Sequence, residues 1–339
     1  MAASDNSAQA KRGRDDALDF LKGFLVLIMV VHHSLEYFMG RDYPAIKYFD
    51  FVTGAFVFVA GFVVSNIYGA RLGLISRQTC WRLIQRACKI ILLFLVINTA
   101  INVVVKSNYN GRPFGLAQFY SESYSVFWPG NKAVAAFEIL LPIAYTLIVS
   151  ALLLLWFRVK LLLVLPVSGL LVYCSLLEDP PFNLYYLCLG LSGFGVGLFC
   201  DRARAHTLIQ NHYRVIFVVC TGVYVALITY LHKDNLPLYL FGIVSIVGAF
   251  YLYAVDFNYA WPTNRAVVLL GQYSLLGYLA HILFLQLLYR LVRQPWLSAG
   301  CAIIPLFLAC AFLFALCRTT QSLRRRIGSA DYFYKLIFA

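Results

Sequence analysis

The sequence predicts an all-α fold, a polytopic bundle of about ten transmembrane helices with both termini in the cytoplasm. Three observations lead to this prediction: few charged residues, repeated long apolar runs, and an uneven distribution of Lys and Arg along the chain. The 339 residues are 61% apolar and 13% charged, about half the charge of an average soluble domain. A lipid bilayer accommodates such a chain, because surface that faces lipid is apolar.

Apolar runs long enough to cross the hydrocarbon layer recur along most of the chain. A helix needs about 20 such residues to cross about 30 Å. We expect spans at roughly 17–39, 46–69, 87–105, 133–157, 160–177, 182–200, 213–231, 237–256, 266–291 and 297–317. The chain then divides into a polar cytoplasmic tail at 1–16, a transmembrane domain at 17–317 and a basic cytoplasmic tail at 318–339.

The basic residues predict the orientation of the bundle. With the N-terminus inside, the inner segments hold 20 of the 28 Lys and Arg residues and the outer segments hold 8. Lys and Arg collect on the cytoplasmic side of membrane proteins, so both termini are predicted to be cytoplasmic. The same pattern argues against a nucleic-acid partner, because the basic residues lie between apolar spans and not along one solvated face. The nine cysteines show no metal-binding spacing.

Ionisable residues inside the first span are the most informative feature. Lys22 and His33 are eleven residues apart and share one helix face, about 16 Å apart along the axis. Glu36 follows His33 at the i+3 position, where a carboxylate can orient an imidazole and raise its basicity. His32 points about 100° away and is the less favoured base. The alternative is a pair of interfacial histidines near the outer headgroups.

The ninth span carries a second polar stripe. Ser274, Tyr278 and His281 lie at i, i+4 and i+7 on one helix face. His281 lies about 22 Å along its span and His33 about 24 Å along the first, in spans that run in the same direction. Two stripes at matching depth are what one shared buried site requires. The alternative is a hydrogen-bonded seam that only packs two helices together.

Three further features allow a functional and a plain interpretation. Glu138 is an acid at the outer end of the fourth span, and a buried acid there needs a partner, a proton or water. A basic stripe where the third span enters the membrane suits phosphate binding or simple anchoring; its members are Arg82, Arg86 and Lys89. The outer loop 106–132 is rich in aromatic and amide residues, which suits sugar binding or an interfacial aromatic belt.

Several motifs of this sequence resemble those of the acyltransferase 3 superfamily. The matching positions are Asp19-x-x-Lys22-Gly23 with His33, Phe56 to Gly61, Arg86 and Lys89, and Leu270-Gly271, Ser274, Tyr278-Leu279 and His281. Within it, Phe56 to Phe58 and Glu138 to Pro142 are similar to the branch that succinylates periplasmic glucans. Lys22 stands where the family usually has Arg, Ala60 where Ser is common, and Gly54 where the glucan branch has an acid.

The resemblance implies a reaction and a set of roles. An acyl group, acetyl or succinyl, would move from cytoplasmic acyl-CoA to a hydroxyl of a glycan or glycolipid on the outer side of a bacterial inner membrane. His33 would be the general base, held by Glu36, and no metal or redox cofactor would be needed. Phosphates of CoA would be held by Lys22, Arg82, Arg86 and Lys89. Ser274, Tyr278 and His281 would line the acceptor side or stabilise the oxyanion, and Asp19 and Glu138 would also bind substrate. Lys22 would belong to the catalytic group with His33 and Glu36.

Two other classes of protein stay open on the residues alone. Intramembrane His, Glu and Lys also build proton-coupled pathways, so a transporter or flippase without covalent chemistry is an alternative. Transporters of this kind often contain paired halves with broken helices, and no such pairing is visible in this sequence. A scaffold subunit whose polar seams serve only packing is the third possibility.

Overall fold

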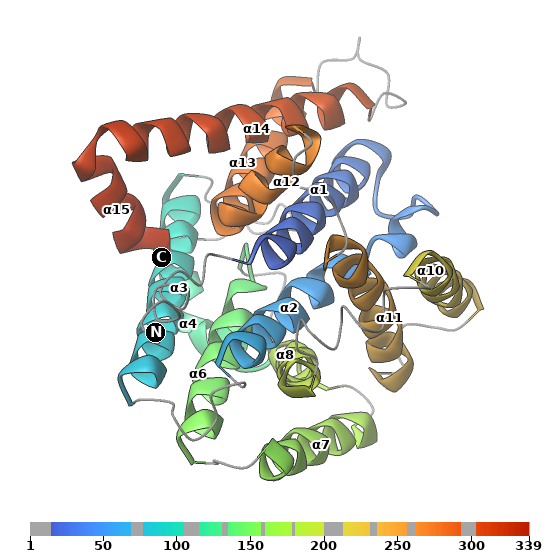
Figure 1. The fold of residues 1–339 in the computed structure, drawn as a ribbon. Coiled ribbons are helices and arrows are strands. Elements are labelled where there is room, and N and C mark those ends of the chain that lie inside the picture. Colours follow the sequence, from blue (N-terminus) through green and yellow to red (C-terminus); the bar gives the residue numbers. More distant parts are fainter. Residues whose placement is uncertain are drawn as a thin grey trace, which may run out of the picture.

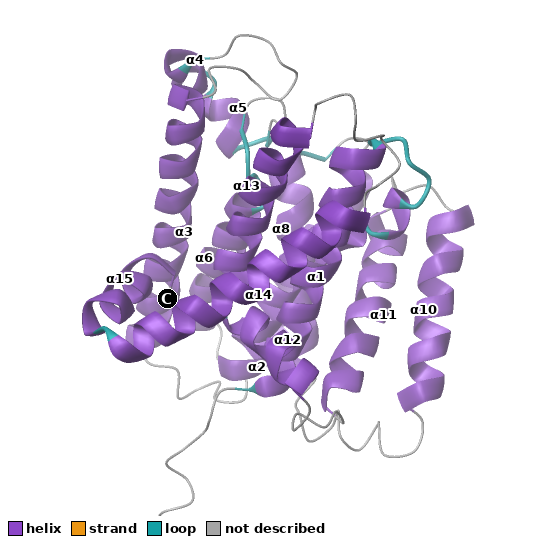
Figure 2. Ribbon diagram, turned by 90° about the horizontal axis from the view of Figure 1, so that it is seen from above, coloured by secondary structure: helices purple, strands orange, loops and turns teal. Residues whose placement is uncertain are grey.

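The computed structural model describes residues 15–68, 77–104, 115–130, 135–156, 160–177, 180–199, 213–230, 236–255, 262–292 and 303–338. Within these residues all regular secondary structure is helical, as Figure 2 shows. The predicted tail 1–16 and the predicted loop 106–132 lie partly outside the described residues.

The helices follow the predicted apolar runs. They are α1 (Asp16–Met39), η1 (Ile46–Tyr48), α2 (Phe51–Tyr68), α3 (Arg77–Val104), α4 (Leu116–Ser121), α5 (Ser123–Phe127), α6 (Leu140–Trp156), α7 (Lys160–Leu176), α8 (Phe182–Phe199), α10 (Tyr213–Tyr230), α11 (Leu236–Val255), α12 (Pro262–Gln272), α13 (Ser274–Val292), α14 (Ile303–Arg326) and α15 (Gly328–Phe338). Among the described residues, seven helical segments are long and apolar enough to cross a bilayer, and three apolar helices are shorter. These ten segments lie on the ten predicted runs, which confirms the polytopic helical bundle.

Two predicted spans differ from continuous helices. The ninth is divided at Tyr273 into α12 and α13, although the Gly277 N–H still donates to the Tyr273 carbonyl across the irregular turn, over 2.8 Å. The fourth span was predicted to begin at 133, but residues 135–139 are not helical and α6 begins at Leu140. Phe137 within that segment has a φ of 59°, which an α-helix does not allow.

Glycines bring α1 and α12 into backbone contact. A Cβ on Gly23 would overlap the Val267 carbonyl oxygen, and a Cβ on Gly271 would overlap the Asp19 carbonyl oxygen. Small residues at such crossings let two helix backbones approach closely, which is the main source of packing energy between helices in lipid. Figure 1 shows α1 beside α12 and α13. This contact sets the distance between the first and the ninth spans.

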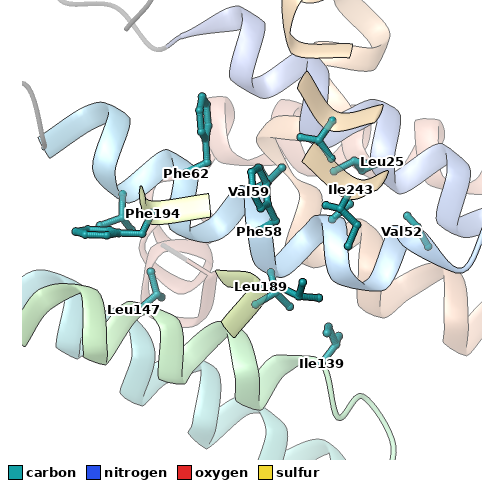
Figure 3. Close-up of a cluster of buried hydrophobic side chains, with 14 of the residues drawn as sticks. Leu25, Val52, Phe58, Val59, Phe62, Ile139, Leu147, Leu189, Phe194 and Ile243 are labelled. Carbon is teal, nitrogen blue, oxygen red and sulfur yellow. The ribbon is translucent and has the colours of Figure 1, made fainter. Parts of the chain in front are cut away.

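A second close contact joins α2 and α8 in the middle of the bundle. Gly61 of α2 lies against the Gly190 carbonyl oxygen of α8, where a Cβ would not fit. Around it lies a cluster of buried apolar side chains from several helices, which Figure 3 labels: Leu25, Val52, Phe58, Val59, Phe62, Ile139, Leu147, Leu189, Phe194 and Ile243. This cluster fixes α2 and α8 against α1, α6 and α11.

The end of the chain folds back on the bundle. The Arg324 guanidinium donates to the Asp331 carboxylate (Nε–Oδ1 2.8 Å) and to the Tyr273 hydroxyl (3.2 Å). It also lies 4.1 Å from the centre of the Tyr334 ring. The Lys335 ammonium pairs with Asp331 at 2.6 Å. Residues 318–338, predicted only as a basic tail, therefore complete α14 and form α15 beside α3, as Figure 1 shows.

The Asp331 carboxylate is expected to hold α15 in place. Lys335 and then Arg324 lower the pKa of Asp331, because both cations favour its ionised form. This stabilisation is present above the ordinary carboxyl pKa and is lost as pH falls through the lowered value. Replacement of Asp331 with Asn should therefore speed amide hydrogen exchange over 328–338 at neutral pH, whereas Ser329→Ala should not. Equal protection in Asp331→Asn and the wild type would contradict this role.

Candidate functional site

His33 and Glu36 form a hydrogen-bonded pair in the C-terminal half of α1. The His33 Nδ1 lies 3.1 Å from the Glu36 Oε2, and the other carboxylate oxygen accepts from the Arg41 Nε at 2.8 Å. Because an ionised carboxylate only accepts, Nδ1 of His33 carries a proton, and its Nε2 is the basic nitrogen of the neutral ring. The pair has the geometry of a base and its orienting acid.

The His281 ring of α13 lies next to the His33 ring. Their centroids are 5.4 Å apart and the ring planes are inclined by 31°. His281 is fully buried, and its Nδ1 donates to the Gly277 carbonyl oxygen of its own helix over 2.9 Å. Its Nε2 has no hydrogen-bond partner among the described residues. The stripes predicted on the first and ninth spans therefore meet at one place in the bundle.

Tyr278 and Glu138 extend this cluster toward α6. The Tyr278 ring centroid lies 5.9 Å from that of His281 and 5.7 Å from that of Phe137. Glu138 is buried and directly follows Phe137, the residue whose ring contacts Tyr278. The structure thus brings together a histidine pair, a phenol and an acid that the sequence had indicated one by one.

Asp19 and Lys22 lie at the opposite end of α1. The Lys22 Nζ is 2.6 Å from the Asp19 Oδ1, and Asp19 is 2% exposed in the first turn of the helix. A negative charge in the first turn is favoured by the helix dipole, and the ammonium neutralises it further. Lys22 and His33 are separated by about 16 Å along the helix axis. Lys22 and His33 therefore share one face of α1 but lie at different depths.

The remaining predicted residues lie away from the histidine pair. Arg82 and Arg86 are exposed on the first turns of α3, and the Lys89 Nζ donates to the Lys335 carbonyl oxygen of α15 at 3.1 Å. Ser274 is the half-buried first residue of α13, about 10 Å along the helix from His281. The basic stripe and Ser274 are thus not in the first layer around the two imidazoles.

A second histidine–acid pair lies beside the first and was not predicted from the sequence. The His32 Nε2 lies 2.9 Å from the Asp50 Oδ1, at the start of α2, and the His32 ring lies edge-on to His33 with centroids 5.1 Å apart. Asp50 was overlooked because it is 18 residues from His32 and lies near one end of the predicted span 46–69, where an acid can reach water. Adjacent histidines were the available signal, since both rings needed a polar partner at that depth.

One group of described side chains has the spacing of a metal site. Single ligand atoms of His32, His33 and Glu36 lie within 4.8 Å of one another. Imidazole and carboxylate are common zinc ligands. In the structure, however, Glu36 accepts from Arg41 as well as from His33, and His32 is paired with Asp50. We therefore keep the prediction that the site works without a metal, and it is tested below.

The fold and the site define a class of protein: a multi-pass membrane protein with two adjacent imidazoles among its helices, one buried and one half-buried. The profile of a protein family described as "Acyltransferase domain" matches residues 15–316. The chain belongs to this family, the acyltransferase 3 superfamily, and is accordingly a membrane acyltransferase. Searches of curated proteins and of solved structures give no match.

Proposed function

We propose that this protein moves an acetyl or succinyl group from cytoplasmic acyl-CoA to a hydroxyl of a glycan or glycolipid on the outer side of a bacterial inner membrane. The observation that carries the proposal is the His33–Glu36 pair facing the buried His281 ring at 5.4 Å. The similarity of Phe56 to Phe58 and of Glu138 to Pro142 to the glucan branch makes a periplasmic glucan the preferred acceptor.

His33 is the better base of the two histidines. When an imidazole takes a proton it becomes a cation, and the Glu36 carboxylate stabilises that cation directly. His281 is fully buried and its Nδ1 faces only a neutral carbonyl, so a positive charge there is costly. In its neutral form the Nε2 of His281 only accepts, which suits it to holding a second hydroxyl of the acceptor while the reacting hydroxyl faces His33.

The reaction balances with the residues of the site and two substrates. The Nε2 of His33 takes the proton of the acceptor hydroxyl, and the oxygen attacks the thioester carbonyl carbon. The Tyr278 ring lies 5.9 Å from the His281 ring, and its hydroxyl would donate to the oxyanion that forms. The C–S bond then breaks, and the thiolate of CoA takes the proton from His33. An acyl ester and free CoA result, and the enzyme returns to its starting state.

The donor would enter from the cytoplasmic side. Lys22, Arg82, Arg86 and Lys89 carry the positive charge there that CoA phosphates need. Lys22 lies near the start of α1, beside the buried Asp19, on the helix that also carries His33. The pantetheine arm would cover the distance of about 16 Å between these two depths.

The acceptor would approach from the outer side. Tyr124 and Trp128 are 75% and 60% exposed in and after α5, and rings of this kind stack on sugars. An aromatic belt at the membrane interface would expose the same side chains. A direct comparison of glucan acylation by the wild type and by Trp128→Ala separates these two interpretations.

Purified protein in lipid nanodiscs, incubated with labelled acetyl-CoA or succinyl-CoA and a β-glucan oligosaccharide, tests the proposal. We expect the label to appear as an ester on the oligosaccharide, with release of free CoA. Passage of the oligosaccharide across a proteoliposome membrane without ester formation would instead support a transporter. Absence of both would refute the acyl-CoA and glucan assignment.

Removal of metal ions should leave this transfer unchanged. The His32 Nε2 pairs with Asp50, the His33 Nδ1 with Glu36, and the Glu36 carboxylate also with Arg41, so proton transfer through the His33 Nε2 needs no cation there. The check is the initial rate before and after dialysis against EDTA, with added zinc as the second condition. A rate that falls on dialysis and returns with zinc would overturn the metal-free mechanism.

A further inference from the structure

A buried amide on α3 holds a non-helical piece of backbone in front of α6. Asn98 is 1% exposed. Its Oδ1 accepts from the Ala136 N–H at 2.7 Å, and its Nδ2 donates to the Ala136 carbonyl oxygen at 2.9 Å. The side chain thus satisfies both polar groups of one residue, 38 positions away in sequence. Irregular backbone at membrane depth is tolerated where such partners exist.

The residue after this clamp has an unfavourable backbone conformation. Phe137 has a φ of 59°, in the left-handed region that bulky side chains rarely adopt, and it is the one such non-glycine position among the described residues. Its ring is 6% exposed. A conformation of this kind is strained and persists only where the surroundings enforce it. Asn98 supplies that enforcement through Ala136.

The strained turn places two groups beside the histidine pair. The Phe137 ring packs edge-on against Tyr278, with centroids 5.7 Å apart, and Tyr278 in turn contacts His281. The next residue, Glu138, is 8% exposed, and the turn fixes the point from which its side chain leaves the backbone. If the α6 helix began before Glu138, the Glu138 side chain would leave the backbone in a different direction. The left-handed turn is therefore what keeps the carboxylate at the site.

We propose that Asn98 is a positioning residue of the acceptor site, which acts by fixing Glu138, and that the Glu138 carboxylate accepts from an acceptor hydroxyl other than the one that is acylated. The inference rests on the proposed function and narrows its substrate class to polyols such as sugar rings. Glu138 directly follows Phe137, whose ring is separated from His281 by Tyr278, so its carboxylate is suited to a neighbouring hydroxyl of the same sugar ring and not to the reacting one.

The first test separates substrate positioning from general stability. Asn98→Ala should raise the KM for a β-glucan oligosaccharide about tenfold, the size expected for loss of one hydrogen bond to a charged group, with the KM for acyl-CoA unchanged. Asn102→Ala is the matched control, because it removes a buried amide one turn further along α3 that donates only to the Asn98 carbonyl among the described contacts. It should leave both KM values unchanged. Equal rises for donor and acceptor in Asn98→Ala would contradict the proposal.

The second test asks whether Asn98 acts through Glu138. Glu138→Gln should raise the acceptor KM by itself, and Asn98→Ala should add little in that background, because residues in one chain of contacts are not additive. Independent effects that multiply would refute the coupling. If Asn98→Ala does not fold, Asn98→Asp keeps an oxygen for the Ala136 N–H and should raise the acceptor KM by a smaller factor.

Two outcomes separate this inference from the proposed function. A wild-type protein that acylates nothing refutes the proposed function. A wild-type protein that acylates, while both variants keep its acceptor KM, refutes this inference alone.

Discussion

Replacement of His33 with alanine is expected to lower the rate of acyl transfer by about 10²–10⁴-fold, the usual contribution of a general base. The reason is local: the Nε2 of His33 is the basic nitrogen, and the Glu36 carboxylate 3.1 Å from its Nδ1 stabilises the charge that develops. The measurement is the initial rate of label transfer from acyl-CoA to the oligosaccharide, with the melting temperature in nanodiscs as the test of folding.

His32→Ala is the matched control, since it removes the neighbouring imidazole of the same helix. His32 is paired with Asp50 through its Nε2, so its loss should lower the rate by less than about tenfold. A larger loss of transfer rate in His32→Ala than in His33→Ala would make His32 the general base. A wild-type transfer rate in His33→Ala would show that His33 is not the general base.

Gly271→Ala is expected to separate α1 from α12 and to abolish most of the activity. A Cβ at this position would overlap the Asp19 carbonyl oxygen, a backbone atom that cannot move aside without shifting α1. Overpacking of this kind costs about 1–3 kcal/mol in a packed interior. Because Gly271 lies ten residues before His281 on the same predicted span, a shift of α1 also changes the distance between the two imidazoles.

The control for this prediction is Gly248→Ala in α11, where a Cβ would have no neighbouring atom within 4 Å. Alanine is favoured over glycine inside a helix by about 0.5–1 kcal/mol, so this variant should melt at the same or a higher temperature. The expected contrast is a lower melting temperature and lost transfer for Gly271→Ala only. Two variants with the same stability and rate would show that the α1–α12 contact does not position the site.

Much of the bundle could be predicted from the sequence because a bilayer imposes a strong rule. Each span needs about 20 apolar residues, so the ten runs were visible without knowledge of packing. The meeting of His33 and His281 could also be predicted, since helical periodicity and a common direction place both at one depth. Glu36 followed from its i+3 spacing to His33.

Features that depend on distant partners could not be predicted. The turn at Phe137 is set by Asn98, 39 residues earlier, and no local pattern in an otherwise apolar segment indicates it. The break at Tyr273 is joined to the C-terminal helix by Arg324, which sequence alone identifies only as one of several basic tail residues. Asp50 became relevant only when the turn after α1 brought it to His32.

The proposed mechanism requires His33 and His281 to act together on one acceptor molecule. The direct test is a double-mutant cycle of kcat/KM for acyl transfer with His33→Ala, His281→Ala and the double variant, in protein of unchanged melting temperature. Residues that act as a unit give strongly non-additive losses, so the double variant should be little slower than His33→Ala alone. Losses that multiply, or a His281→Ala variant with wild-type kcat/KM, would contradict a shared site.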